Sequence, residues 1–402
     1  MLLDLGFRYG KIWQLIFISL MKYFSLMNIL LIPDKFKGSL SAKQVIEALK
    51  SGILRSIPTT TFYEIIASDG GDGFLTAISH IQNTKKVSIK SVDPLGRDLE
   101  SYYLQNNRTA YIELANCSGL ALLMEDERNV LHTSTYGTGL QLKHAIKNGA
   151  KKIYVGLGGS ATNDGGMGIA KALGYKFFDA KQVELDPRGE YLILIKSIVK
   201  PKNYPFGNVQ IYAVNDVKNP LTGKNGATMV YGQQKGADDK ALRLLDDGLK
   251  NLAKVVKEQL HAEIATIPGA GAAGGTAYGL GVFFNATFIP GTQFILQQHK
   301  ILEELNNNHI DLIITGEGKI DDQTTHGKLI DGILEVGRQY NIPVLAVCGM
   351  NELSDKGVYQ LGIKTILEIR DPTKDLQYNM ENAAMLLEKA IYNYFRFIKK
   401  IN

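Results

Sequence analysis

The chain has 402 residues, of which 45% are hydrophobic and 21% are charged, and its formal net charge is +5. This composition is typical of a globular protein and argues against a disordered or fibrous chain. No block of Lys and Arg is interleaved with aromatic residues, so we expect no nucleic-acid partner. The two cysteines, Cys117 and Cys348, suit neither a disulfide framework nor a metal cluster, which favours the reducing cytoplasm.

The first 26 residues differ in pattern from the rest of the chain. Their apolar run, Lys11–Leu20, is shorter than a membrane span and has no signal-peptide cleavage site after it, so we expect no membrane association. Met27 begins the string MNILLIPD, which has the pattern of a buried first strand. We therefore expect residues 1–26 to be an N-terminal extension that is disordered or lies upstream of the true start codon.

From Asn28 onwards, short apolar runs alternate with amphipathic helical stretches. Asn28–Ile32 predicts a strand, and Ser41–Leu54 predicts a helix with Ser39 or Ser41 as its N-cap. This alternation predicts an α/β fold with largely parallel strands. Further strands are predicted at Phe62–Ile66, Lys152–Leu157, Val209–Val214, Asp311–Thr315 and Pro343–Val347, and further helices at Gly137–Lys147, Met167–Tyr175, Ala237–Leu260 and His326–Tyr340.

The stretch from about Thr84 to Leu114 has a different pattern. Short strands are separated here by turn residues, including the string DPLG, which indicates antiparallel hairpins and the start of a second domain. The predicted strands are Val87–Ile89, Tyr102–Leu104 and Tyr111–Leu114.

Open α/β sheets bind ligands at the carboxyl ends of their strands, and several loops there have unusual compositions. The first is SDGGDG, Ser68–Gly73, in which Asp69 and Asp72 stand among three glycines. Two carboxylates so placed can hold a magnesium ion or orient a hydroxyl group. Asp72 by itself can equally be the N-cap of the next helix, but for the pair we favour a functional role.

The second loop is GLGGSATNDGGMG, Gly156–Gly168, between a predicted strand and a predicted helix. Its glycines let backbone N–H groups approach an anion at the positive end of the helix. It is neither a Walker A loop nor a dinucleotide-binding fingerprint. A close helix–strand packing turn is the competing interpretation, and Asp164 can bind magnesium, bind substrate or cap the helix.

The remaining loops carry glycines, acids and lysines. PGAGAAGGTAYGLG, Pro268–Gly281, suits either a ligand at a helix N-terminus or tight packing against another backbone. TGEGKIDDQTTHGK, Thr315–Lys328, suits the handling of a metal and a phosphate. PDKFKGSLSA and NDVKNPLTGKNGA place polar and charged groups at two other strand ends. With no obvious nucleophile, zinc site or hydride-transfer fingerprint, this set of groups favours phosphoryl transfer.

These loops occur in the order seen in type I glycerate kinases, which the chain resembles from Met27 to near Leu367. The resemblance implies ATP-dependent phosphorylation of D-glycerate to 2- or 3-phosphoglycerate with Mg2+. It also implies two α/β domains with the active site in the cleft: a Rossmann-like domain of residues 27–83 and 290–402, and a second domain of residues 84–289 inserted in it. The strings that carry the resemblance are PDKFKGSLSA, SDGGDG, DPLGR, TSTYGTG, GLGGSATNDGGMG, NDVKNPLTG, QKGA, PGAGAAGG and TGEGKIDDQTTHGK.

The kinase hypothesis assigns roles to fourteen of these residues. The catalytic group comprises Asp69, Asp72, Asp164 and Lys37, and the metal ligands are Glu317 and Asp321. The substrate- or nucleotide-binding group comprises Gly158, Gly159, Ser160, Asn215, Asp216, Gly271, Gly274 and Lys328. The chain departs from the family pattern at Lys35, where a Ser is expected, at Asp72, which is often Glu, and at Gln233, where a Pro is usual.

Two other functions remain open from the sequence. The first is a non-catalytic two-domain protein that closes on a small carboxylate, for which the acidic loops would be superfluous. The second is a kinase for another hydroxy acid or a sugar, which a substrate panel would separate from a glycerate kinase.

Overall fold

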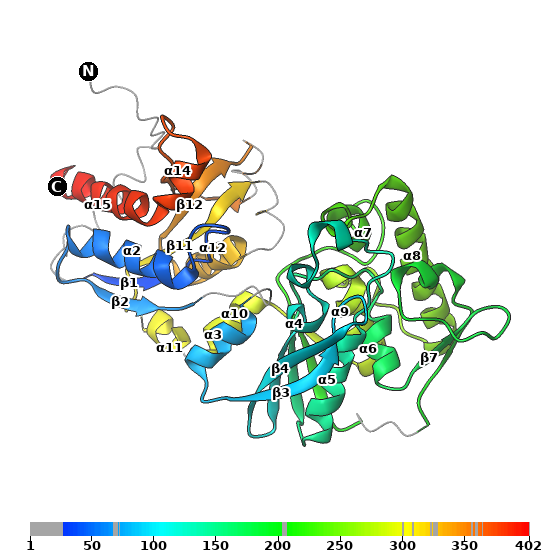
Figure 1. The fold of residues 1–402 in the computed structure, drawn as a ribbon. Coiled ribbons are helices and arrows are strands. Elements are labelled where there is room, and N and C mark those ends of the chain that lie inside the picture. The colour runs from blue at the N-terminus through cyan, green and yellow to red at the C-terminus, as the bar shows by residue number, and fades with distance from the viewer. Residues whose placement is uncertain are drawn as a thin grey trace. The chain divides into compact units, whose positions relative to one another are not determined.

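The chain divides into two compact units in the computed structural model (Figure 1). Unit 1 comprises residues 1–66, 302–323 and 333–402, and unit 2 comprises residues 67–301 and 324–332. The predicted N-terminal extension lies outside the described residues. The structure describes residues 27–66, 71, 73–202, 207–299, 301–307, 309–321, 324, 329–354, 357, 361–363 and 365–401.

Unit 1 is built on a five-stranded parallel sheet with the strand order β13-β12-β11-β1-β2. The interior strand β1 is apolar after its first residue, as expected for a parallel strand that is covered on both faces. The prediction of an α/β fold with parallel strands is therefore confirmed. The strands are β1 (Asn28–Leu31), β2 (Thr61–Glu64), β11 (Leu312–Asp321), β12 (Val344–Glu352) and β13 (Ile366–Glu368).

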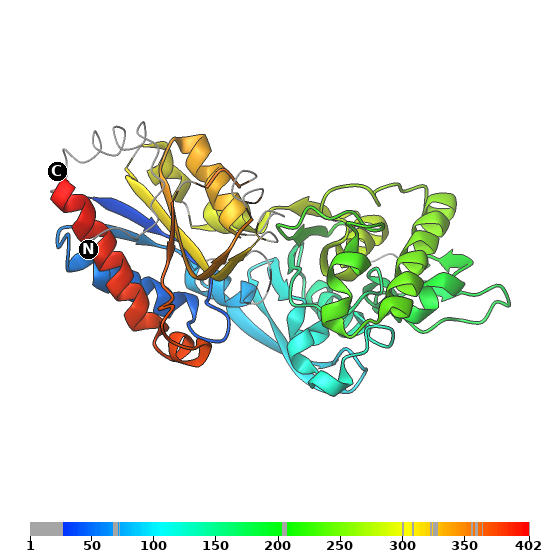
Figure 2. The same ribbon diagram turned by 90° about the horizontal axis from the view of Figure 1, so that it is seen from above.

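Helices lie on both sides of this sheet (Figure 2). α2 (Ala42–Leu54) begins at a capping box formed by Ser41 and Gln44, so Ser41 rather than Ser39 is the N-cap. α2 and α15 (Ala383–Ile401) pack against each other and share one hydrophobic cluster with β1, β11 and β12. α12 (Leu329–Tyr340) lies on the other side of the sheet from α15. The shorter helices are α11 (Ile301–Asn306) and α14 (Leu376–Glu381).

β11 is longer than the sequence predicts. The predicted strand ends at Thr315, because Gly316 and Gly318 have low strand propensity. In the structure β11 continues to Asp321, paired in parallel register with the nine-residue strand β12. The segment 315–321 is therefore a strand and not a loop, since the ladder to β12 outweighs the local preference of the glycines.

Unit 2 contains a six-stranded mixed sheet with the order β10-β9-β6-β5-β4-β3 and a two-stranded antiparallel sheet. The pairs β3–β4 and β4–β5 are antiparallel, which confirms the predicted hairpins, and the other pairs of the large sheet are parallel. The strands are β3 (Lys85–Val92), β4 (Asp98–Asn106), β5 (Thr109–Glu113), β6 (Lys152–Gly156), β9 (Gln210–Val214), β10 (Thr287–Ile289), β7 (Lys176–Phe178) and β8 (Ser197–Val199).

The carboxyl ends of the parallel strands β5, β6, β9 and β10 lie at one edge of this sheet, where two of the predicted functional loops begin, Gly156–Gly168 after β6 and Asn215–Ala227 after β9. Two of the unit 2 helices, α3 and α10, lie outside the predicted bounds 84–289 of the inserted domain. The helices are α3 (Phe74–Ile81), α4 (Ala115–Ser118), α5 (Tyr136–Lys147), α6 (Met167–Ala172), α7 (Ala227–Tyr231), α8 (Asp239–Leu260), α9 (Ala272–Phe284) and α10 (Gly291–Gln298).

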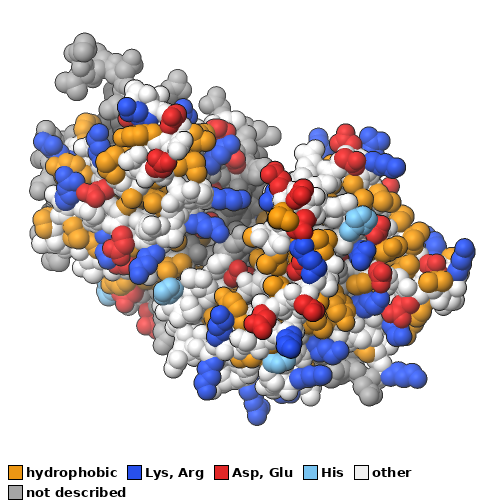
Figure 3. Space-filling model, viewed as in Figure 1, with side chains coloured by type: hydrophobic (Ala, Val, Ile, Leu, Met, Phe, Trp, Pro, Cys, Tyr) orange, Lys and Arg blue, Asp and Glu red, His pale blue; other side chains and the backbone are white. Residues whose placement is uncertain are grey.

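Basic and acidic side chains are interspersed on the face drawn in Figure 3. No helix within the described part of the chain is long and apolar enough to cross a membrane.

Gly52 allows α2 and α15 to approach closely, because a Cβ at this position would meet the side chain of Ile391 and the carbonyl of Glu388. We expect Gly52→Val to lower the free energy of unfolding by about 1 to 3 kcal/mol through overpacking. Urea denaturation measures this loss. Glu47→Ala, on the exposed side of α2, is the matched control and should change stability by less than about 0.5 kcal/mol. Equal stabilities of the two variants would contradict the prediction.

Candidate functional site

Four of the predicted loops meet backbone to backbone in unit 2. A Cβ at Gly158 would collide with the Cα of Gly71, and a Cβ at Gly274 would collide with the carbonyl of Thr162. The amide of Gly271 donates to the carbonyl of Asn219 at 3.0 Å. We call residues 71, 73, 156–168, 215–219 and 268–279 the loop cluster. The loop cluster therefore brings together six of the predicted site residues, which come from three separate strings of the sequence. They are Gly158, Gly159, Ser160, Asn215, Gly271 and Gly274.

The segment Gly158–Ser160 presents free amides. Gly159 has a φ of +61°, and hydrogen bonds of 2.7 and 2.8 Å tie the segment to Ser118–Leu120 through the Gly159 carbonyl and the Ala161 amide. The N–H groups of Gly158, Gly159 and Ser160 donate to no acceptor among the described residues. Successive amides around a left-handed residue form a concavity that binds anions, so this segment can hold a phosphate or carboxylate oxygen.

Asp164 is fully buried and orders this loop from inside. One carboxylate oxygen accepts hydrogen bonds from the Thr135 amide and hydroxyl, both at 2.8 Å, and from the Gly168 amide at 3.1 Å. The other accepts from the Gly166 amide at 3.0 Å. Burial raises the pKa of Asp164, and these hydrogen bonds oppose that rise. The contacts give Asp164 the role of a cap for α6, one of the three roles left open by the sequence, while its catalytic role stays a prediction.

Lys235 contacts the loop cluster, and the sequence-based assignment missed it. Lys235 is 3% exposed, and its ammonium donates to the Ser160 hydroxyl at 2.7 Å and to the Thr162 carbonyl at 2.8 Å. Burial lowers the pKa of Lys235 to about 7, and the charge of Asp164 acts in the opposite direction. The only signal in the sequence was its place in the string QKGA, which belongs to no periodic pattern.

Glu113 was also missed. It ends β5, and its carboxylate accepts hydrogen bonds from the amides of Gly73 at 3.2 Å and Leu75 at 2.9 Å. Gly73, with a φ of +93°, is the N-cap residue of α3, so Glu113 supplies the acceptors that begin this helix. The sequence signal that could have identified Glu113 was an acidic residue near the end of the predicted strand Tyr111–Leu114. Asp69 and Asp72 lie outside the described residues.

Asn215 and Asp216 follow β9 directly. Asn215 is buried, and its amide donates to the Ile289 carbonyl at 3.1 Å. One Asp216 carboxylate oxygen accepts from the Thr292 amide at 2.9 Å and from its hydroxyl at 2.8 Å, which fixes the start of α10. These contacts place both residues at the carboxyl edge of the unit 2 sheet.

The other predicted site residues that the structure describes lie in unit 1. The Asp34 amide donates to the Gly316 carbonyl at 2.8 Å, and Gly318 packs against the backbone of Phe36 and Lys37. The loop that carries Lys37 therefore lies against β11. The Lys37 side chain is exposed, and its ammonium makes no hydrogen bond or ion pair with the described residues. Lys328 lies outside them.

Glu317 and Asp321, the predicted metal ligands, lie on β11. Four residues of strand separate their Cα atoms by roughly 13 Å, which is too far for both to bind one magnesium ion directly. Asp321 lies 3.8 Å from the Lys319 ammonium, which also pairs with Glu352 at 2.6 Å. The described residues contain no group of three or more His, Cys, Asp or Glu that could hold a metal. Magnesium usually takes one or two carboxylates together with waters and phosphates, so either acid fits such an ion singly.

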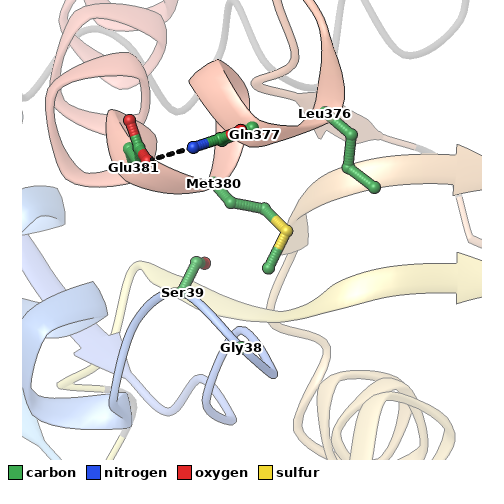
Figure 4. Close-up of a pocket in the computed structure, with 6 residues that line it drawn as sticks. All are labelled: Gly38, Ser39, Leu376, Gln377, Met380 and Glu381. Atoms are coloured by element: carbon green, nitrogen blue, oxygen red, sulfur yellow. Dashed lines mark hydrogen bonds between the residues drawn. The ribbon is translucent and has the colours of Figure 1, made fainter.

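A separate pocket of about 580 Å³ lies in unit 1 between α14 and the loop after β1 (Figure 4). Leu376 and Met380 give it an apolar wall, and the Met380 side chain points toward the loop. The Gln377 amide donates to the Glu381 carboxylate at 2.9 Å. None of the predicted site residues lines this pocket, so we assign it no part in the candidate active site. Its lining residues are Gly38, Ser39, Leu376, Gln377, Met380 and Glu381.

Replacing Asp164 should destabilise the protein. In Asp164→Asn, one oxygen becomes an N–H donor that faces other donors, and we expect a loss of about 1 to 3 kcal/mol in the free energy of unfolding. Denaturant titration followed by circular dichroism measures it. Asp179→Asn is the control, since Asp179 also accepts two backbone amides, both at 2.8 Å, but in an exposed turn. A loss no larger than that of the control would refute the capping role.

Comparisons with known proteins agree on one family. The sequence profile of the glycerate kinase family matches residues 29–399. A glycerate kinase of Halalkalibacterium halodurans is 39% identical over 370 residues, which cover 91% of this chain and 97% of that protein. The glycerate 2-kinase of Escherichia coli is 35% identical over 347 residues, 85% of this chain and 90% of that protein. A crystal structure of a candidate glycerate kinase 2 from Salmonella typhimurium has a TM-score of 0.75 at 32% identity and covers 93% of this chain and 99% of its own. The chain therefore belongs to the glycerate kinase family.

Proposed function

We propose that this protein transfers a phosphoryl group from ATP to a hydroxyl of D-glycerate and releases 2- or 3-phosphoglycerate. Membership of a kinase family implies the use of ATP. The observation that carries the proposal is the row of three free amides at Gly158–Ser160, placed against the Gly71 loop at the carboxyl edge of the unit 2 sheet. Both substrates are anions, and such a row of amides suits a carboxylate or phosphate oxygen.

Phosphoryl transfer asks the protein mainly to position reactants and to stabilise charge. The amides of Gly158, Gly159 and Ser160 would hold one anionic group, without the cost of reorganising solvent during the reaction. Lys37, an exposed ammonium on the loop after β1, would neutralise charge on another. Asp69 is proposed to accept the proton of the reacting hydroxyl.

Magnesium is proposed as the metal of the reaction, where it would screen the charge of the phosphates. Glu317 and Asp321 supply the hard oxygen ligands that this ion prefers. Because they lie far apart along β11, one of them would bind the ion directly and the other at most through water. Asp72 is proposed to act in catalysis together with Asp69. Lys328 is proposed to contact a phosphate.

Two alternative functions use the same loops. The first is a binding protein that only closes on a small carboxylate. Such a protein would not catalyse the phosphoryl transfer of the kinase family to which the chain belongs. A kinase for another hydroxy acid would use the same groups, and only the substrates distinguish it. The experiment must therefore detect turnover and compare substrates.

Purified protein with D-glycerate, ATP and magnesium should release ADP, measured by a coupled assay, and phosphorus NMR of the product should show which hydroxyl was phosphorylated. Removing magnesium with EDTA should abolish turnover, and adding it back should restore it. L-glycerate, lactate and simple sugars form the comparison panel. Absence of ADP release with D-glycerate, or a preference for another acceptor, would overturn the assignment.

Asp69→Asn should remove turnover, with a loss of at least about 100-fold in kcat, because the amide cannot accept the hydroxyl proton. Thermal unfolding should stay close to that of the unchanged protein. Asp126→Asn, at an exposed position, serves as the control and should leave kcat unchanged within about twofold. Activity retained in Asp69→Asn would exclude Asp69 as the base.

A further inference from the structure

Lys235 combines features that packing alone does not require. It is a charged side chain almost completely buried, and burying a charge is costly unless it is paired and hydrogen-bonded. Its three ammonium protons meet only one hydroxyl and one carbonyl among the described residues, those of Ser160 and Thr162. Both partners belong to the segment next to the free amides of Gly158–Ser160.

The direction of the hydrogen bond to Ser160 matters. An ammonium has donors and no acceptor, so Ser160 must accept from Lys235 with its oxygen. The Ser160 hydroxyl proton is then left over, and it has no acceptor among the described residues. Accepting a charge-assisted hydrogen bond also makes the hydroxyl a stronger donor. Ser160 is itself 7% exposed, which leaves a small area for contact with a ligand.

We propose that Lys235 is a positioning residue of the kinase reaction: as an ammonium it turns the Ser160 hydroxyl into a hydrogen-bond donor for an anionic oxygen of the substrate bound at the Gly158–Ser160 amides. The oxygen belongs to the carboxylate of glycerate or to a phosphate of ATP. The inference rests on the proposed function, and it adds a residue that acts through Ser160 without touching the substrate.

Loss of the ammonium proton reverses this arrangement. A neutral amine carries a lone pair that can accept the Ser160 proton, so the hydroxyl no longer donates outward. Burial lowers the pKa of Lys235 to about 7, and the negative charge of Asp164 opposes that effect. Two further charged residues lie beside this turn: Arg128, whose backbone packs against Gly236, and Asp238, the N-cap of α8, whose carboxylate accepts from the Ala241 amide at 2.7 Å.

Activity should decline with rising pH. The ammonium is the active form, so kcat/KM for the substrate held at these amides should fall as pH rises through about 7, the pKa of Lys235. A bound anion favours the ammonium and raises the pKa of Lys235 in the complex. The corresponding fall in kcat should therefore lie at higher pH than the fall in kcat/KM.

Steady-state kinetics across the neutral pH range, with D-glycerate and ATP varied in turn, tests the proposal. Lys235→Met and Ser160→Ala should each lower kcat/KM for one substrate by about 10- to 100-fold at low pH, the value of a hydrogen bond to a charged group. Both should also abolish its decline above neutral pH. The substrate affected identifies the source of the anionic oxygen. Ser160→Ala removes only a hydroxyl, so it remains informative if Lys235→Met does not fold.

The double variant separates this role from simple support of the backbone. If Lys235 acts through Ser160, the double variant should be no more than about twofold worse than either single variant. Additive losses, or a pH decline that persists in Ser160→Ala, would overturn the proposal. Lys171→Met is the matched control, because Lys171 also donates to a backbone carbonyl, that of Leu185 at 3.0 Å, away from Ser160. It should stay within about twofold of the unchanged protein.

Failure of the proposed function would be visible separately, as no ADP release by the unchanged protein with D-glycerate. In that case calorimetric titrations with ATP and with D-glycerate, each added alone, test Lys235 by binding. Weaker binding of either ligand above neutral pH that becomes independent of pH in Ser160→Ala would support the role of Lys235. Binding of both ligands that is the same in both proteins at every pH would refute it.

Discussion

The close approach of glycine backbones is the constraint on which the rest of the candidate site depends. Gly158 against Gly71, Gly274 against Thr162 and Gly279 against Gly165 leave no room for a Cβ atom at the contact. Through these contacts, segments from distant parts of the chain form one layer at the edge of the unit 2 sheet. A side chain at any of these positions would move a backbone carbonyl or amide, and with it the amides that face a ligand.

Polar side chains then hold this layer in one conformation from within. Asp164 and Lys235 are both buried behind the segment Gly158–Ser160, one collecting amides and the other donating to a hydroxyl and a carbonyl. Ionised groups are costly to bury and are worth most where an exact geometry is needed. The interior of the loop thus holds two ionisable side chains, while the segment Gly158–Ser160 presents uncharged N–H groups to a ligand.

The periodic patterns of the sequence predicted the α/β fold and the hairpin region well, because apolar runs and amphipathic helices are local signals. They failed where pairing overrides local preference, as at Gly316 and Gly318, which β12 holds in a strand. The glycine-rich strings could be recognised as unusual from the sequence. The contact between Gly158 and Gly71 could not be predicted, because such contacts are set by the whole fold. Lys235 and Glu113 were missed because their roles depend on partners far along the chain.

The order of the strands in unit 1 also bears on how the protein is made. β1 is the first strand of the described chain, yet its neighbours in the sheet are β2 and β11, and the Asn28 amide bonds to Asp311, 283 residues later. At about 5 to 20 residues per second, the ribosome needs roughly 15 to 60 s to supply that partner. During this time the edge of β1 that later pairs with β11 stays open, while all the strands of unit 2 are completed. An apolar strand edge exposed for so long is a site for chaperone binding or for mispairing between nascent chains, so the fold carries a risk of aggregation from the beginning of synthesis.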